Sequence, residues 1–122
     1  MSAFSDAELA YLRDRRMGRL ATSDAAGQPH VVPIGMWRYN AELDTIDVTG
    51  RDFAKTRKFR NVQANPQAAF VIDDMASIDP WRPRSVLVMG PAVALPDDPS
   101  SNGSALIRIT PAKVVSWGLD AG

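Results

Sequence analysis

The stretch TGRDFAKTRKFRN, residues 49–61, carries the strongest signal in this sequence and lies between a predicted strand and a predicted helix. Within it, five cations fall in ten residues: Arg51, Lys55, Arg57, Lys58 and Arg60. Backbone N–H groups near a helix start, a hydroxyl and flexible cations together form a good cradle for a phosphate. Charge alone would more often mean a solvated basic helix face, so the surrounding segments have to support the phosphate interpretation.

Short strands surround this stretch on both sides. We expect strands at 18–23, 29–38 and 45–49 before it, and at 68–73, 85–95, 106–110 and 114–117 after it. Pro33 cannot donate to a ladder, so its strand lies at a sheet edge or has a bulge. Gly90-Pro91 interrupts another strand and indicates a bulge or a barrel corner. Polar loops are predicted at 74–83 and 96–104.

Two helices accompany the strands. Ser5 and Glu8 have capping-box spacing, and Gly18 fits the end of this first helix. The second helix is expected over 52–64, capped by Asp52 and ended by Asn65-Pro66. Six to seven strands with an N-terminal helix and one inserted helix predict a mainly β fold, an antiparallel barrel with added helices. The length of 122 residues fits one domain, 1–122.

Composition excludes several classes of function. Fourteen basic residues balance fourteen acidic ones, so charge indicates neither a nucleic-acid nor a membrane partner. The chain has no cysteine and one histidine, His30, so we expect no metal site. No apolar run reaches membrane-spanning length, and the first residues do not resemble a signal peptide, so we expect a cytoplasmic protein. The sequence has no GxGxxG and no P-loop, which disfavours the common nucleotide-binding folds.

Several segments together resemble a known family. Thr56-Arg57-Lys58, followed by Asn61 and Asn65-Pro66, resembles the phosphate-binding motif of the pyridoxamine-phosphate-oxidase-like split barrels. Residues 18–33 resemble the first hairpin of that superfamily, and residues 65–71 resemble its strand after the helix. Residues 39–43, 79–84 and 109–118 resemble a compact group within it, described as probable F420-dependent enzymes. The order and spacing of these pieces make the resemblance fairly specific.

This resemblance implies a split β-barrel, a homodimer and a cofactor at the subunit interface. Arg57, Lys58 and Thr56 would hold the cofactor phosphate, and residues 31–34 would lie along its ring system. Arg51 and Arg60 would meet either a negatively charged tail or only solvent. The full cofactor-binding set that the resemblance implies is Val31, Val32, Pro33, Ile34, Thr49, Arg51, Thr56, Arg57 and Lys58.

The implied activity is that of an F420-dependent oxidoreductase, which transfers a hydride between the deazaflavin and a small conjugated acceptor. No nucleophile–base set is visible, so the catalytic residues are unknown, and the cofactor would supply the chemistry. An FMN-dependent oxidoreductase of the same fold is one alternative. A non-catalytic cofactor-binding protein is another. The basic cluster favours the deazaflavin, because its tail carries several glutamates.

Four further side chains have more ordinary explanations. His30 has no visible partner and is more simply an incidental strand residue than a proton donor. Trp37, Trp81 and Trp117 are more typical of core or interface anchors than of a ring-stacking site. Trp81 is the best stacking candidate, because it lies in a predicted loop with two arginines. The neighbours Asp73 and Asp74 point to opposite faces of a strand and form no acid/base pair.

Overall fold

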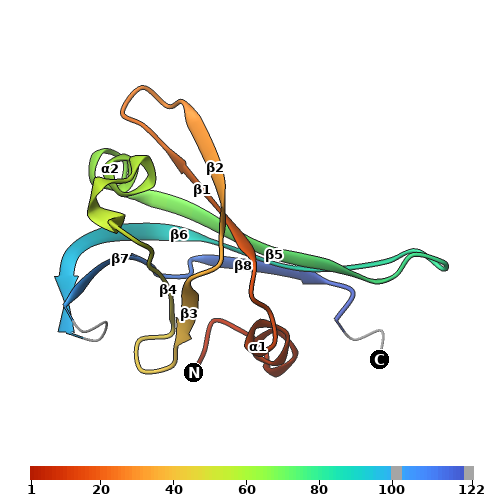
Figure 1. Cartoon of the computed structure of the whole chain (residues 1–122). Helices are drawn as coiled ribbons and strands as arrows, with labels where there is room; N and C mark the ends of the chain where they lie inside the picture. Colours follow the sequence, from red (N-terminus) through yellow and green to blue (C-terminus); the bar gives the residue numbers. More distant parts are fainter. Residues whose placement is uncertain (100–102, 120–122) are drawn as a thin grey trace.

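The computed structural model describes residues 1–99 and 103–119 and is dominated by antiparallel strands (Figure 1). Among these residues it contains two α-helices, one 3₁₀ turn and eight strands. In chain order they are α1 (Asp6–Arg13), β1 (Gly18–Ser23), β2 (Pro29–Ile34), β3 (Trp37–Asn40), β4 (Thr45–Val48), η1 (Phe53–Lys55), α2 (Arg57–Ala64), β5 (Gln67–Ser77), β6 (Arg82–Asp98), β7 (Ser104–Ile109) and β8 (Lys113–Trp117). The mainly β, antiparallel split-barrel prediction is confirmed, with one strand more than expected.

The strand order shows where the barrel is split. Neighbouring strands follow the order β2-β1-β5-β6-β7-β4-β3, and β8 pairs with β6. The expected single strand over 29–38 is wrong: the chain turns at Gly35 and Met36, and β2 and β3 stand at opposite ends of the order. Over the described residues the sheet is therefore open, and β2 is an edge strand, as Pro33 predicts.

Gly90-Pro91 is a corner of the barrel. On one side of it, residues 85–89 of β6 pair with β8; beyond it, β6 pairs with β7 from Ala92 onward. A Cβ on Gly90 would lie 2.0 Å from the carbonyl oxygen of Thr110, so only glycine fits this crossing. The sequence prediction of a corner is confirmed.

Both helices start or end differently from the prediction. The capping box is present: the Ser5 hydroxyl accepts from the Glu8 N–H at 3.1 Å, and the Glu8 carboxylate accepts from the Ser5 N–H at 2.8 Å. However, α1 ends at Arg13, and Gly18 opens β1, where a Cβ would lie 2.3 Å from the Phe70 ring. That glycine makes room for packing and does not end a helix.

The second helix begins later than expected. Asp52 has φ 46°, makes no capping bond and leads into the short turn η1. Thr56 caps α2 instead, because its hydroxyl reaches the Phe59 N–H at 3.4 Å. The sequence could not separate these two starts, since both residue types cap helices.

The β5–β6 hairpin is longer than predicted and projects from the body as an arm (Figure 1). The expected loop 74–83 shrinks to the turn between Ser77 and Arg82. Asp74 holds the strands together at the base of the arm: the Arg84 guanidinium binds both of its oxygens, and the Tyr11 hydroxyl donates to it at 2.8 Å. Strand ends also take up part of the expected loop 96–104, since β6 runs to Asp98 and β7 begins at Ser104; residues 100–102 lie outside the described residues.

One inner layer of side chains forms the core. Leu20, Phe70 and Val88 face it from three adjacent strands, while Phe59 and Val62 of α2 close one end; each of the five is at most 1 % exposed. Neither α1 nor α2 has the length and apolar character needed to cross a bilayer, and the same holds for every helix in the described ranges.

A buried ionic network ties β3, β4 and β7 together. Asp47, 1 % exposed, binds the Arg108 guanidinium through two contacts of 3.0 Å and also accepts from Asn40 and Thr45. Burial alone would raise the pKa of the Asp47 carboxyl, but these hydrogen bonds lower it overall.

Candidate functional site

The cation-rich loop begins next to the short link between β2 and β3. The Thr49 N–H donates to the carbonyl of Met36 at 2.9 Å, just after β2 ends. Residues 49–58 then run through η1 into α2. The predicted phosphate-binding segment therefore starts beside Met36, two residues after the end of β2, while β2 itself pairs with β1.

The start of α2 carries two cations where a helix favours anions. Arg57 and Lys58 occupy its first turn, and that turn has no acidic residue. Within residues 1–99 and 103–119, neither side chain forms an ion pair. The N–H groups of the first helical turn lack helical partners, and the positive end of the helix dipole repels cations. This arrangement is unfavourable by itself and suits an added anion.

Lys58 is held in place without a carboxylate. Its ammonium lies 5.3 Å from the centroid of the Phe53 ring, and Phe53 is 3 % exposed. Burial lowers the pKa of Lys58 below its ordinary value. A Cβ on Gly50 would approach Phe53 to 3.0 Å, so the glycine lets the loop pass close over this ring. The loop thus presents a partly desolvated cation on an aromatic platform.

Thr56 has a different local role from the predicted one. Its hydroxyl donates to the carbonyl of Phe53 at 2.6 Å, and its N–H donates to the same oxygen at 3.1 Å. With both donors used inside the turn, Thr56 positions the start of α2. Contact with a phosphate would require its hydroxyl to rotate away.

Two other arginines of the loop lie at the surface. Arg51 is exposed and forms no ion pair within the described parts of the chain. Arg60 is exposed too, and its guanidinium donates to the carbonyl of Lys55 at 2.7 Å. Both can reach an anionic group that extends beyond the helix start.

Of the four β2 residues predicted to bind the cofactor, two lie at the surface. Val31 is 64 % exposed and Pro33 is exposed, whereas Ile34, at 5 % exposed, belongs to the core. Val32 is half-buried. In the β1–β2 hairpin the Asp24 N–H donates to the Gln28 carbonyl. Because hydrogen-bonded and non-hydrogen-bonded pairs alternate along an antiparallel ladder, Val31 and Pro33 fall in non-hydrogen-bonded pairs. Their polar backbone groups therefore point away from β1, to the free edge of the sheet.

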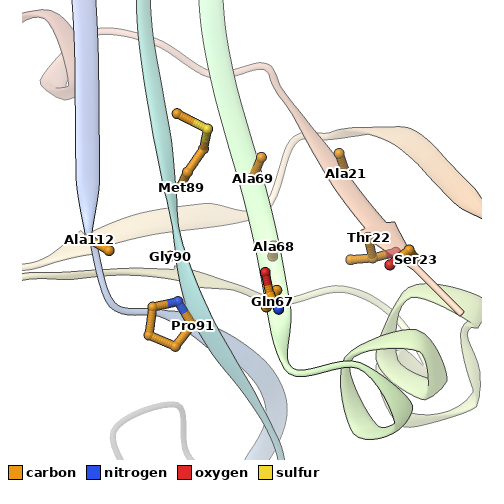
Figure 2. A pocket seen from close by; sticks show the side chains of 10 residues that line it. All are labelled: Ala21, Thr22, Ser23, Gln67, Ala68, Ala69, Met89, Gly90, Pro91 and Ala112. Carbon is orange, nitrogen blue, oxygen red and sulfur yellow. The ribbon is translucent and has the colours of Figure 1, made fainter. Parts of the chain in front are cut away.

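The outer face of the sheet contains an open hollow beside this edge (Figure 2). Its volume is about 660 Å³, and it lies over β1, β5 and β6. Val31, Ala21, Ala69 and Met89 form one row of cross-strand partners that leads from the edge into it. Several of the lining side chains are small, among them Ala21, Ala69 and Ala112 (Figure 2). The sequence analysis did not predict this hollow. The sequence feature that indicates it is the presence of alanines at outward positions of adjacent strands.

Helix α2 borders the same region. The Asn61 amide donates to the Thr22 hydroxyl at 3.0 Å, and the Asn65 amide donates to the Ser23 hydroxyl at 2.7 Å. Thr22 and Ser23 also line the hollow, which no cation of the loop lines. In one chain, the cation cluster and the hollow are therefore adjacent parts of an open surface, not one enclosed cavity.

The aromatic and acidic candidates form no catalytic set. The Trp37 indole donates to the Arg16 carbonyl at 3.1 Å and packs edge-on against Phe70, so Trp37 is a core anchor. Trp81, at the tip of the arm, is 71 % exposed and Trp117 is 49 % exposed. Within the described residues, His30 Nδ1 is buried and has no hydrogen-bond partner.

The expected separation of the two neighbouring carboxylates is confirmed. Asp73 pairs with Arg19, and Asp74 pairs with Arg84. Each carboxylate has its own cation, so the two do not share a proton as a catalytic pair would.

Comparisons with known proteins agree with this fold. The family model described as pyridoxamine 5'-phosphate oxidase matches residues 4–118. A curated relative from Streptomyces rimosus, 5a,11a-dehydrotetracycline/5a,11a-dehydrooxytetracycline reductase, is 42% identical over 121 residues, which cover 96% of this chain and 84% of that protein.

Solved structures show the same fold at lower identity. A conserved hypothetical protein from Mycobacterium tuberculosis superposes with a TM-score of 0.75 at 22% identity, covering 96% of this chain and 86% of the other. An FAD binding protein from Mycobacterium smegmatis has a TM-score of 0.68 at 20% identity, with 96% and 97% covered. At these identities the likeness concerns the fold alone.

Proposed function

Because this chain belongs to the pyridoxamine 5'-phosphate oxidase family, we propose that it is an F420-dependent oxidoreductase that reduces a small conjugated acceptor. The observation that carries the proposal is the cation pair Arg57–Lys58 in the first turn of α2, with no acidic residue in that turn. A phosphate group would supply the missing negative charge and would accept from the free N–H groups of the helix start. The 42% identical reductase supports the direction of the reaction.

Different residues would bind different parts of the cofactor. Arg57 can grip a phosphate with two parallel N–H donors, and Lys58 adds a point charge from its aromatic platform. Val31 and Pro33 present backbone groups at a free sheet edge, where the polar edge of a ring system can be met. A reduced deazaflavin supplies a hydride from a ring carbon and does not favour one-electron or oxygen chemistry. Among residues 1–99 and 103–119 no acid/base pair lies at this edge, so we expect the proton that completes the product to come from solvent or from a local side chain.

The cations favour a deazaflavin over FMN. One phosphate needs no more than the pair Arg57–Lys58, yet Lys55, Arg51 and Arg60 lie in the same ten-residue stretch. Arg51 and Arg60 are exposed, so they can contact a flexible tail that carries carboxylates. Such exposed contacts weaken with added salt, because charges are screened over about 8–10 Å at physiological ionic strength.

We further propose that the protein acts as a homodimer with its cofactor at the interface. The outer sheet face exposes Val31 and Trp117, and its hollow is open on the side away from the core. A second copy would cover this apolar surface and turn the open site into an enclosed one. Light scattering should give about twice the 13.3 kDa chain mass.

Competition titration tests the choice of cofactor. We expect F420 to bind more tightly than FMN, with the difference shrinking as salt rises. Arg57→Gln should weaken F420 binding by about 10- to 150-fold, the value of one charge-assisted contact of about 1.5–3 kcal/mol. The matched variant Arg13→Gln removes a cation on α1, outside the proposed site, and should leave the affinity unchanged. Tighter binding of FMN, or normal binding by Arg57→Gln, would contradict the assignment.

A further inference from the structure

A second pocket lies between α1 and β3, away from the residues proposed to hold the cofactor. It has a volume of about 440 Å³ and is lined chiefly by Leu9, Leu12, Arg13, Arg15, Trp37 and Tyr39. We infer that this pocket binds a planar organic anion, such as an aromatic carboxylate. The inference stands independently of the proposed reductase function, because it uses none of the same residues.

The apolar walls of the pocket are fixed before any ligand arrives. Trp37 is locked by its bond to the Arg16 carbonyl and by its edge contact with Phe70, whose ring centroid lies 5.2 Å away. Tyr39 packs edge-on against Phe4 with 5.5 Å between ring centroids. Rigid aromatic walls favour a flat, carbon-rich ligand, since little side-chain freedom is lost when it binds.

The polar part of the lining is cationic. The pocket contains no aspartate or glutamate in its lining. Arg13 is exposed and forms no ion pair in the described parts of the chain. Arg15 contacts Asp74 at 3.4 Å, but Arg84 already holds the same carboxylate through two shorter bonds.

The Arg15 side chain is 27% exposed, so the terminal nitrogens of its guanidinium are the atoms that a ligand would meet. Its Nε atom is buried and has no hydrogen-bond partner among the described residues, so it would not contact the ligand. The central carbon of its guanidinium, Cζ, lies 4.5 Å from the centroid of the Tyr11 ring, which keeps the planar group in one orientation. A carboxylate entering the pocket would meet three guanidiniums, those of Arg13, Arg15 and Arg38. Arg15 and Arg38 also contact Asp74 and Asp47, two carboxylates that lie outside the lining.

The chemistry excludes a bare inorganic anion as the preferred ligand. Phosphate or sulfate would lose its hydration against Leu9, Leu12 and Trp37 without gaining apolar contact. A ligand with an aromatic body and one negative charge satisfies both halves of the lining. The volume is also in the range of about 300–1,000 Å³ typical of small-molecule pockets.

Nuclear magnetic resonance of the full chain tests the inference with 2-naphthoate as probe. The indole N–H signal of Trp37, assigned with Trp37→Phe, should shift in a saturable manner, while those of Trp81 and Trp117 should not. The neutral analogue 2-naphthamide should bind at least about tenfold more weakly, because it makes no charge-assisted contact.

Two matched variants separate a built site from general charge attraction. Arg13→Gln should weaken 2-naphthoate binding by about tenfold, whereas Arg16→Gln, which removes a cation outside the lining, should leave it unchanged. An unshifted Trp37 signal at millimolar probe would overturn the inference. Equal binding of the neutral analogue, or equal effects of the two variants, would overturn it as well. None of these results depends on F420.

Discussion

Replacing Lys58 by methionine should stabilise the free protein and weaken its cofactor binding at the same time. Methionine keeps an unbranched apolar stem next to Phe53 but removes the positive charge from the first turn of α2. In the free protein that charge faces the positive end of the helix dipole with no acidic residue in that turn. In the complex the same charge would face the phosphate.

The sizes of the two effects follow from their causes. Removing a cation from a helix start is worth about 0.3–1 kcal/mol at low ionic strength. The lost cation–π contact with Phe53 is replaced by a contact of similar size between the methionine sulfur and the same ring, so the helix-start effect decides the sign. For a domain of this length, that raises the melting temperature by about 1–5 °C. Loss of one charge-assisted contact of about 1.5–3 kcal/mol should lower F420 affinity by about 10- to 150-fold.

The stabilisation should also depend on pH. Burial places the pKa of Lys58 below its ordinary value of 10.5, so protonated Lys58 destabilises the folded state. That cost is fully present at neutral pH and fades as the pH rises through the lowered pKa towards 10.5. Denaturation curves of the wild type and Lys58→Met should therefore differ at neutral pH and converge in strong alkali.

Urea denaturation and cofactor titration of the same samples measure both effects. Lys55→Met is the matched control, since it removes an exposed cation just outside α2 and should change stability by less than about 0.5 kcal/mol. If Lys58→Met destabilises the free protein, or if both variants bind F420 equally well, the argument for an anion site at this helix start is refuted.

Three further substitutions and one control, Gly27→Asn, test the fold that positions the site. Asp47→Asn leaves the guanidinium of Arg108 without its carboxylate and should destabilise by about 3–5 kcal/mol in urea; in the wild type, the stabilisation from ionised Asp47 should be lost as the pH falls through its lowered pKa. Gly90→Ala places a Cβ 2.0 Å from a backbone oxygen and should cost about 3 kcal/mol or more, whereas Gly27→Asn, at φ +87° with open space, should cost about 1 kcal/mol or less. Tyr11→Phe removes the 2.8 Å bond to the base of the arm and should lower the unfolding free energy by about 1 kcal/mol.

Local patterns in the sequence predicted those features that depend on few residues. The Ser5–Glu8 capping box, the edge position of Pro33 and the corner at Gly90-Pro91 each follow from the chemistry of one or two residues. The cation-rich loop was also visible, because its charges are contiguous in the chain. Its position beside the link that follows β2 was not, since the bond between Thr49 and Met36 depends on the register of β3 and β4.

The features that sequence reasoning missed depend on packing between distant segments. Gly18 reads as a helix end, yet it makes room for Phe70 from a neighbouring strand. The break at Gly35 and Met36 carries no proline, so 29–38 reads as one strand. The arm extends beyond its predicted strands because Asp74 pairs with Arg84 on the opposite strand. This pairing depends on the register of β5 and β6, which the sequence does not show.

Transfer of isotopic label tests the central claim most directly. Reduced F420 carrying deuterium at its hydride-donating ring carbon would be mixed with the purified protein and a panel of enones and quinones. The account predicts that at least one enone product gains a single deuterium on carbon, and that Arg57→Gln lowers the rate of labelling at subsaturating cofactor. Tight binding of F420 with no labelled product across the panel would contradict the reductase assignment and indicate a cofactor-binding protein.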